Sequence, residues 1–154
     1  MRLYALRPDP ATGSLEDAEV VDESKYGWQF LEQGITLWRL VDKDRADQIK
    51  AIKDRAARSA PEESRFYTED LRALVRLLTG VEDAIIAAGI VDGHWRVPAN
   101  RLEELARQVP AMDLTTERSL KSKTNALGEV MSNAISIRNF LSSAVNAGCV
   151  VVLG

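Results

Sequence analysis

The chain has one histidine and one cysteine among its 154 residues, and these scarcities argue against several kinds of site. A structural zinc site takes about four ligands, chiefly histidine and cysteine, so we expect no metal. A single cysteine forms no internal disulfide, and Cys149, between a glycine and a run of valines, is interpreted as a small buried hydrophobic residue. Phosphate-binding loops, dinucleotide motifs and nucleophile elbows are also missing, so we expect no cofactor and identify no catalytic residue.

Long apolar runs and an excess of positive charge are missing as well. No apolar run approaches the ~18 residues that a membrane-spanning helix needs. The formal net charge is −3, whereas binding to nucleic acid generally depends on basic residues that neutralise phosphates. We therefore expect a cytoplasmic protein that neither spans a membrane nor binds nucleic acid.

What the sequence does contain is the composition of an ordinary globular protein. Hydrophobic residues make up 45% of the chain and charged residues 28%, which are usual proportions for globular domains. No internal repeat, low-complexity tract or linker divides the chain. Its length is that of one domain, so residues 1–154 are predicted to form a single domain.

The most regular pattern lies at the C-terminal end. Apolar residues recur there in alternating steps of three and four, which is the spacing of one face of an α-helix. This face consists of Leu127, Val130, Ala134, Ile137, Leu141 and Ala144. We predict a helix over 116–147 that ends at Gly148, because glycine readily adopts the left-handed cap conformation. The apolar run 149–153 then predicts a strand covered on both faces.

A second stripe of the same period precedes it. Its members are Leu71, Leu74, Leu78, Val81, Ile85 and Ala88. They predict a continuous helix over 69–88 that ends at Gly89. Because the two stripes match in period and length, we expect the two helices to be antiparallel and to bury these faces against each other.

Shorter elements complete the predicted fold. They are helices over 44–58 and 100–108, and strands over 3–6 and at 20–21. The segment 35–41 fits a strand and a helix equally well, and we favour a strand. The predicted fold class is α+β: a predominantly helical single domain with two long antiparallel helices and a small sheet that includes the N- and C-terminal strands.

One charged residue interrupts the apolar face of the C-terminal helix. At about 100° per residue, Arg138 lies about 20° from Leu127, in the middle of that face. A buried guanidinium without a partner would cost several kcal/mol. Glu82 lies at the edge of the stripe over 71–88 and is the first candidate partner. We predict a buried or half-buried ion pair between Arg138 and Glu82.

The opposite face of the same helix is polar but almost uncharged. It consists of Asn125, Glu129, Ser132, Ser136, Asn139 and Ser143. Solvated helix faces usually carry lysine and glutamate, whereas small uncharged side chains permit close approach of another surface. This stripe is therefore either an ordinary solvated face or a contact surface for a partner, including a second copy in a homodimer.

The negative charge is localised along the chain. Residues 1–40 and 59–97 each contain four basic and seven acidic residues. Acidic patches suit partners with basic surfaces. We predict a small acidic protein-interaction domain that covers such a surface, as an inhibitor of the toxin-neutralising (immunity) kind does. The candidate partner-binding residues are Glu16, Asp17, Glu19, Asp22, Glu23, Glu62, Glu63, Ser132, Ser136 and Asn139.

The alternative hypothesis is a small enzyme or ligand-binding domain whose site is built from scattered residues. His94, Arg96 and Arg138 are its best candidates. A deep pocket that contains Arg138 and a carboxylate of shifted pKa would favour this alternative. Because the sequence carries no catalytic motif, we favour the interaction domain.

Overall fold

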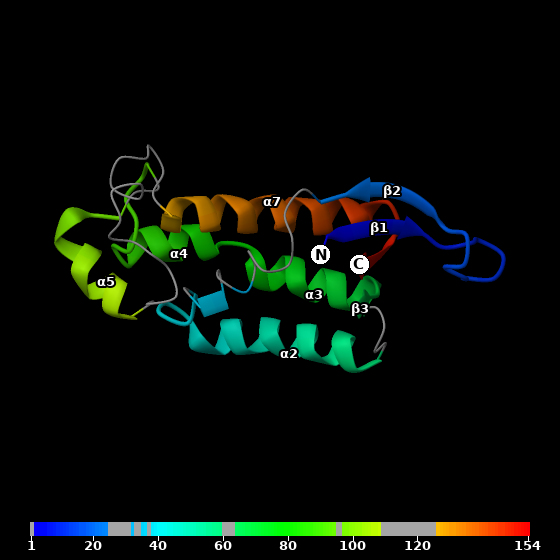
Figure 1. Cartoon of the computed structure of the whole chain (residues 1–154), viewed down its shortest axis with the longest axis horizontal. Helices are drawn as coiled ribbons and strands as arrows, with labels where there is room; N and C mark the ends of the chain where they lie inside the picture. The colour runs from blue at the N-terminus through cyan, green and yellow to red at the C-terminus, as the bar shows by residue number, and fades with distance from the viewer. Residues whose placement is uncertain are drawn as a thin grey trace.

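A computed structural model describes residues 2–24, 32, 35–36, 38–59, 64–94, 97–108 and 126–154 (Figure 1). Its elements, in chain order, are β1 (Leu3–Arg7), β2 (Glu19–Glu23), α2 (Lys43–Ser59), β3 (Ser64–Phe66), α3 (Thr68–Leu78), α4 (Val81–Ala87), the 3-10 helix η1 (Ala99–Arg101), α5 (Leu102–Gln108), α7 (Ala126–Asn146) and β4 (Val150–Leu153). The predicted class is confirmed, because helices pack with a small antiparallel sheet that includes the N- and C-terminal strands.

The sheet has the strand order β2-β1-β4-β3, and every neighbouring pair is antiparallel. β1 and β4 pair from Leu3 opposite Leu153 to Leu6 opposite Val150. Beyond that register the Arg2 N–H donates to the Gly154 carbonyl oxygen at 2.8 Å. As the β-branched run predicted, β4 is central and buried, and Val151 is 0% exposed.

The strand predicted over 35–41 is wrong. The described residues of that segment are helical at 35, 36 and 38 and turn-forming at 39–41. The Arg39 N–H donates to the Ile35 carbonyl oxygen at 3.1 Å, and both Ile35 and Trp38 are buried. Helical spacing turns these two side chains to the same side, into the core. The remaining strand of the sheet is β3 instead, which inserts Phe66 into the core.

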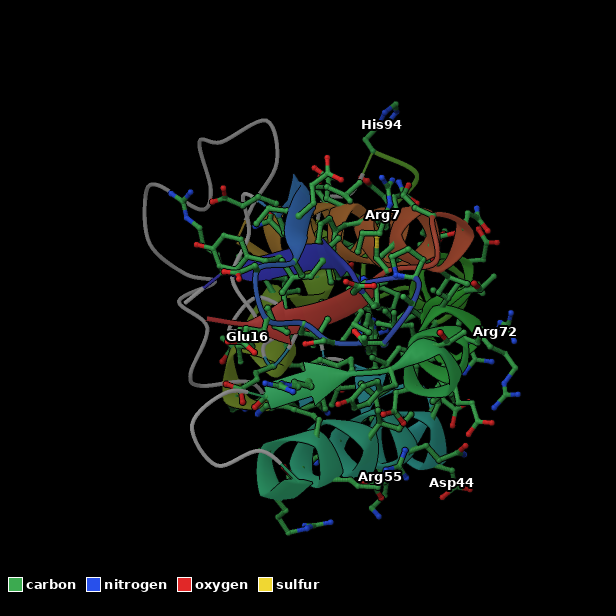
Figure 2. The ribbon with its side chains drawn as sticks, turned by 90° about the vertical axis from the view of Figure 1, so that its right-hand side faces the viewer. Arg7, Glu16, Asp44, Arg55, Arg72 and His94 are labelled. Atoms are coloured by element: carbon green, nitrogen blue, oxygen red, sulfur yellow. The ribbon has the colours of Figure 1, made fainter. Side chains whose placement is uncertain are left out.

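Helices cover one face of the sheet. Figure 2, seen from one end, shows α7 beside β1 and β2, α3 beside β4 and β3, and α2 below them. The buried apolar residues of these layers form one cluster. Its members from the sheet include Leu3, Ala5, Val151 and Phe66, and those from the helices include Ile49, Leu71, Leu74, Ile137 and Leu141. This single core agrees with the predicted single domain.

The helix predicted over 69–88 is broken into two. α3 ends at Leu78, Thr79 is extended, and Gly80 adopts a left-handed φ of 81° before α4 begins. Glycine takes this conformation at little cost because it lacks a Cβ. The apolar spacing continues across the break, so Val81 and Ile85 of α4 are still buried. The apolar stripe was therefore predicted correctly, but the continuous backbone was not.

α7 runs antiparallel to α3 and α4 and packs on α3, as expected (Figure 1). It ends in a Schellman motif: the Cys149 N–H donates to the Ala144 carbonyl oxygen at 2.9 Å, and the Gly148 N–H donates to that of Val145 at 3.1 Å. Gly148 has a φ of 68°, which confirms the predicted end. The predicted start, 116–125, lies outside the described residues. Among the described residues, no helix is long and apolar enough to cross a membrane.

Candidate interaction surface

The hairpin of β1 and β2 projects from one end of the molecule (Figure 1). Its connection, residues 8–18, is organised by the Asp9 side chain, whose Oδ1 accepts the Ala11 N–H at 2.7 Å. Gly13 and Asp17 have left-handed φ values of 71° and 56°. These features define the conformation of the turn that joins β1 to β2.

Negative charge is concentrated on this hairpin. Residues 2–24 contain two arginines, Arg2 and Arg7, and six acidic residues. The acidic residues are Asp9, Glu16, Asp17, Glu19, Asp22 and Glu23. The hairpin thus has a formal charge of −4, whereas the whole chain has −3. Every residue of β2 is exposed, and Figure 2 looks onto this end of the molecule with Glu16 labelled.

Two of these carboxylates are neutralised within the hairpin. Glu23 pairs with Arg2, and Glu19 pairs with Arg7 at 3.2 Å. These pairs are exposed, so solvent screens them and they contribute little to stability. Among the described residues, no basic side chain pairs with the other four acids, Asp9, Glu16, Asp17 and Asp22. Asp9 is used within the turn, where its Oδ1 accepts the Ala11 N–H. The carboxylates of Glu16, Asp17 and Asp22 are therefore the ones that we consider for a basic partner.

Apolar side chains accompany the charge on β2. Val20 is 55% exposed and Val21 is 38% exposed, and both belong to an edge strand of the sheet. The register between β1 and β2 shifts between Ala5 and Leu6, where Val21 is the additional residue on β2. A bulge and flanking acids are features that discourage edge strands from pairing with identical edges. The exposed valines therefore offer apolar contact area on a strand that resists self-association.

The Ser/Asn stripe of α7 lies on the outer side of that helix. Ser132, Asn139 and Ser143 are exposed, and Ser136 is half-buried with its hydroxyl donated to the Ser132 carbonyl oxygen at 3.1 Å. The opposite side of α7 supplies core residues such as Ile137. Asn125 and the Glu129 side chain lie outside the described residues. The described part of the stripe is thus a polar, uncharged surface.

The structure brings this stripe together with the acidic hairpin. A hollow of about 200 Å³ lies where β2 meets the C-terminal end of α7. It is lined by Ala5, Val21, Asp22, Ser143, Ala144, Ala147 and Cys149. Cys149 is 1% exposed, and burial raises the pKa of its thiol. One residue of the stripe, Ser143, and one acid of the hairpin, Asp22, therefore line the same hollow.

The ion pair predicted within the helical layer is present. Arg138 of α7 donates from Nη1 to Glu82 Oε1 of α4 at 2.6 Å. The exposed fractions of the two side chains are 19% and 22%. The pair therefore joins α7 to α4 in a mostly buried position and has a structural role.

The alternative site around His94, Arg96 and Arg138 is not assembled by the described residues. His94 is exposed, and Figure 2 shows its side chain pointing away from the molecule. The main-chain N–H of His94 donates to Asp92 Oδ1 at 2.8 Å, so this residue belongs to a local turn. Arg96 lies outside the described residues, as do Glu62 and Glu63 of the predicted partner-binding set.

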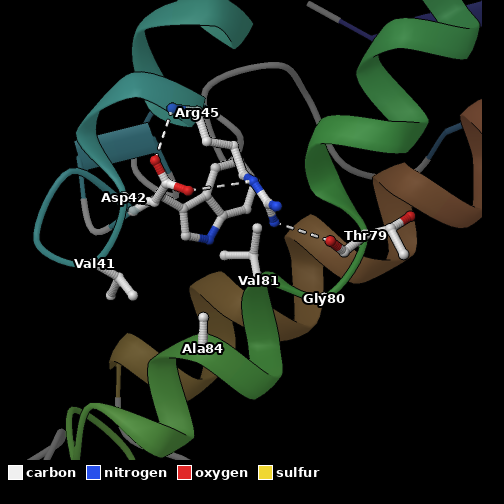
Figure 3. A pocket seen from close by; sticks show the side chains of 8 residues that line it. Val41, Asp42, Arg45, Thr79, Gly80, Val81 and Ala84 are labelled. Carbon is white, nitrogen blue, oxygen red and sulfur yellow. Dashed lines mark hydrogen bonds and ion pairs between the residues drawn. The ribbon is translucent and has the colours of Figure 1, made fainter.

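A cleft that the sequence did not indicate lies between the start of α2 and the break at Gly80 (Figure 3). Its volume is about 270 Å³. Arg45 crosses it, donating from Nη1 to the Thr79 carbonyl oxygen at 3.0 Å, while Arg45 Nε lies 3.7 Å from Asp42 Oδ2. The indole N–H of Trp38, which also lines the cleft, has no hydrogen-bond partner in the described part of the chain. The glycine inside an apolar helical stripe was the available signal for this cleft.

We searched the described residues for side chains that could bind a metal ion. Among them, no group of three or more histidine, cysteine, aspartate or glutamate side chains could hold an ion. The acids of the hairpin are spread along a strand and a turn, and two of them are occupied by arginines. The hairpin is therefore better suited to contacts with a basic surface than to coordination of an ion.

Comparisons of the chain with protein-family models, with curated proteins and with solved structures found no match. A function for it therefore has to be inferred from its own residues. The geometry that bears on function is the acidic hairpin, the Ser/Asn stripe and the hollow between them.

Proposed function

We propose that this protein is an interaction domain that binds the basic surface of another protein through the β1–β2 hairpin and the outer side of α7. The observation that carries the proposal is the formal charge of −4 on a projecting hairpin, with four of its six carboxylates left without a basic partner among the described residues. The form of this function that we favour is inhibition by covering the partner's surface, as in inhibitors of the toxin-neutralising (immunity) kind.

The chemistry of the surface supports this kind of partner. A concentrated charge of one sign accelerates association with an oppositely charged protein and disfavours other partners. Val20 and Val21 add apolar area beside the charge. The small side chains of Ser132, Asn139 and Ser143 permit a partner to approach α7 closely.

A second copy of the chain fits this surface less well. A two-fold symmetric dimer places the same patch on both sides of its interface. Two hairpins that carry the same negative charge would then face each other, and like charges in contact are unfavourable. A different protein with a basic surface is therefore the partner that we propose, in preference to a homodimer.

The test is capture of the partner from the native host, with identification by mass spectrometry. The bait is compared with a hairpin variant that combines Glu16→Gln, Asp17→Asn and Asp22→Asn. The matched control combines Asp44→Asn, Glu69→Gln and Glu103→Gln, which removes three exposed acids elsewhere and changes the net charge equally.

We expect a basic protein to be retained by the wild type and by the control and lost from the hairpin variant. Its retention should also weaken as salt is added, because exposed charges are screened. Equal retention by the hairpin variant, or the absence of any specific protein under gentle conditions, would contradict the proposal.

We also propose that the protein acts in the cytoplasm. Support comes from its single cysteine, which is buried and therefore unavailable for the disulfides that extracellular proteins commonly use. Fractionation of the native host should place the protein with cytoplasmic markers. Its recovery in a secreted fraction would contradict this location.

A further inference from the structure

We propose that the hollow between β2 and the C-terminal end of α7 receives one arginine or lysine side chain of the partner. The inference rests on the proposed function, because it takes the partner to be basic. It goes further by assigning a single anchor position to one cation. Figure 1 shows β2 running beside the C-terminal end of α7, where the hollow lies.

The walls of the hollow suit the stem of such a side chain. Ala5, Ala144 and Ala147 border it with methyl groups, and Val21 adds a larger apolar side chain. Its volume is about 200 Å³. The methylene stem of arginine or lysine can bury itself along apolar walls while its head stays near water.

Asp22 supplies the negative charge at this position. It differs from its neighbours on β2, because Glu19 and Glu23 are paired with Arg7 and Arg2. No basic side chain in the described part of the chain pairs with Asp22. Its Oδ1 accepts the Glu23 N–H at 2.8 Å, which orients the carboxylate beside the hollow. A hydrogen bond between an entering cation and an oriented carboxylate is stronger than one between neutral groups.

The end of α7 adds a second source of negative potential. The C-terminus of a long helix carries a partial negative charge, and cations near it are stabilised. α7 has 21 residues and no basic residue in its last turn, so its own side chains supply no compensating cation. The Ser143 hydroxyl lies at the same place and can accept a hydrogen bond from the entering group. Arg7 acts electrostatically on Cys149 in the lining of the hollow, but it is paired with Glu19 at 3.2 Å. The helix end, the Asp22 carboxylate and the apolar walls together favour a cation with an apolar stem.

The test uses a short probe in place of the partner. The blocked peptide acetyl-Gly-Arg-Gly-amide is titrated into the isotope-labelled protein, and the backbone amide signals are followed by NMR. The control peptide replaces arginine with citrulline, which has a similar shape but no charge. We expect the arginine peptide to shift the amide signals of residues 20–22 and 143–149, and the citrulline peptide to leave them unchanged.

Protein variants separate the hollow from the general charge of the hairpin. Asp22→Asn should weaken binding of the arginine peptide about fivefold, as expected for the loss of one partly exposed pair. Ala147→Leu should abolish the response by filling the hollow without changing the charge. Asp17→Asn is the matched control, because Asp17 lies on the same hairpin but not in the lining of the hollow. It should weaken binding of the peptide less than Asp22→Asn does.

Equal weakening by Asp17→Asn and Asp22→Asn, or an unchanged response in Ala147→Leu, would overturn the anchor site. A citrulline peptide that binds as well as the arginine peptide would do the same. If the hairpin variant still fails to capture the partner, these outcomes contradict the anchor site alone and not the proposed function. A normal peptide response combined with unaltered capture by the hairpin variant would instead remove the proposed function.

Discussion

Removal of the Arg138 head group should destabilise the fold, because the ion pair with Glu82 joins α7 to α4. The substitution Arg138→Ala leaves the Glu82 carboxylate without its partner at 2.6 Å in a mostly buried position. It also removes the arginine stem from the apolar side of α7, where a long side chain contributes packing as well as charge.

The magnitude follows from the burial of the pair. Breaking a fully buried pair costs about 3–5 kcal/mol, whereas an exposed pair contributes about 0.2–1 kcal/mol. Side-chain exposures of 19% and 22% place this pair nearer to the buried case. We expect the free energy of unfolding to fall by about 2–3 kcal/mol. For a chain of this length that corresponds to a decrease in Tm of about 5–10 °C.

Thermal and denaturant unfolding of Arg138→Ala, Glu82→Gln and the double variant measure this loss and the coupling between the two side chains. We expect a coupling energy of about 1–2 kcal/mol. Arg72→Ala is the control on an exposed helix surface and should shift Tm little. Arg101→Ala should also destabilise less, because the Arg101 pair with Glu104 is more exposed, at 31% and 49%. Equal Tm values for Arg138→Ala and Arg101→Ala would refute the reasoning.

Three further predictions follow from single positions. Gly80→Ala should lower the free energy of unfolding by about 1–2 kcal/mol, because Gly80 has a left-handed φ, whereas Gly93→Ala should have little effect. Trp38→Phe should lower the free energy of unfolding by about 1–3 kcal/mol, because Trp38 is 2% exposed and a smaller ring leaves a void. Its indole N–H has no partner among the described residues, so no hydrogen bond is lost; unchanged chemical unfolding would contradict this packing. Cys149 should react slowly with iodoacetamide until the protein unfolds, because burial raises its thiol pKa. Because the pKa of the thiol is higher in the folded state, its contribution to stability is fully present below the unfolded-state pKa and is lost as pH rises through the folded-state pKa. Rapid labelling of Cys149 in the native protein would contradict the burial.

Much of the fold could be predicted because it is encoded by regular spacing. The apolar steps of α7, the glycine that ends it and the β-branched run of β4 are local signals, and the structure confirms them. The ion pair of Arg138 and Glu82 followed from the physical requirement that a charge on an apolar helix face needs a partner.

The errors arose where local patterns were equally compatible with two structures. The apolar stripe continues across Gly80, so its spacing did not show that the backbone breaks there. Ile35 and Trp38 fit the spacing of a helix and of a strand. In the structure both side chains are buried from a helical segment, and β3 occupies the edge of the sheet. Tertiary packing commonly overrides such ambiguous local preferences.

The hollow could not be predicted from the sequence. Val21 and Asp22 are more than a hundred residues from Ser143 and Ala147, and only the strand order of the sheet brings β2 beside the end of α7. The acidic segment and the Ser/Asn stripe were each visible in the sequence as separate features. Their juxtaposition depends on nonlocal strand pairing, for which neither segment carries a signal.

The most direct test of the proposed interaction surface is backbone amide hydrogen exchange of the protein, free and bound to the partner captured from the native host. We predict slower exchange on binding at residues 16–23 of the hairpin and 132–143 of α7, and unchanged exchange in α2 and α5. Protection centred on α2, α5 or the cleft at Trp38, with the hairpin unaffected, would contradict the proposal.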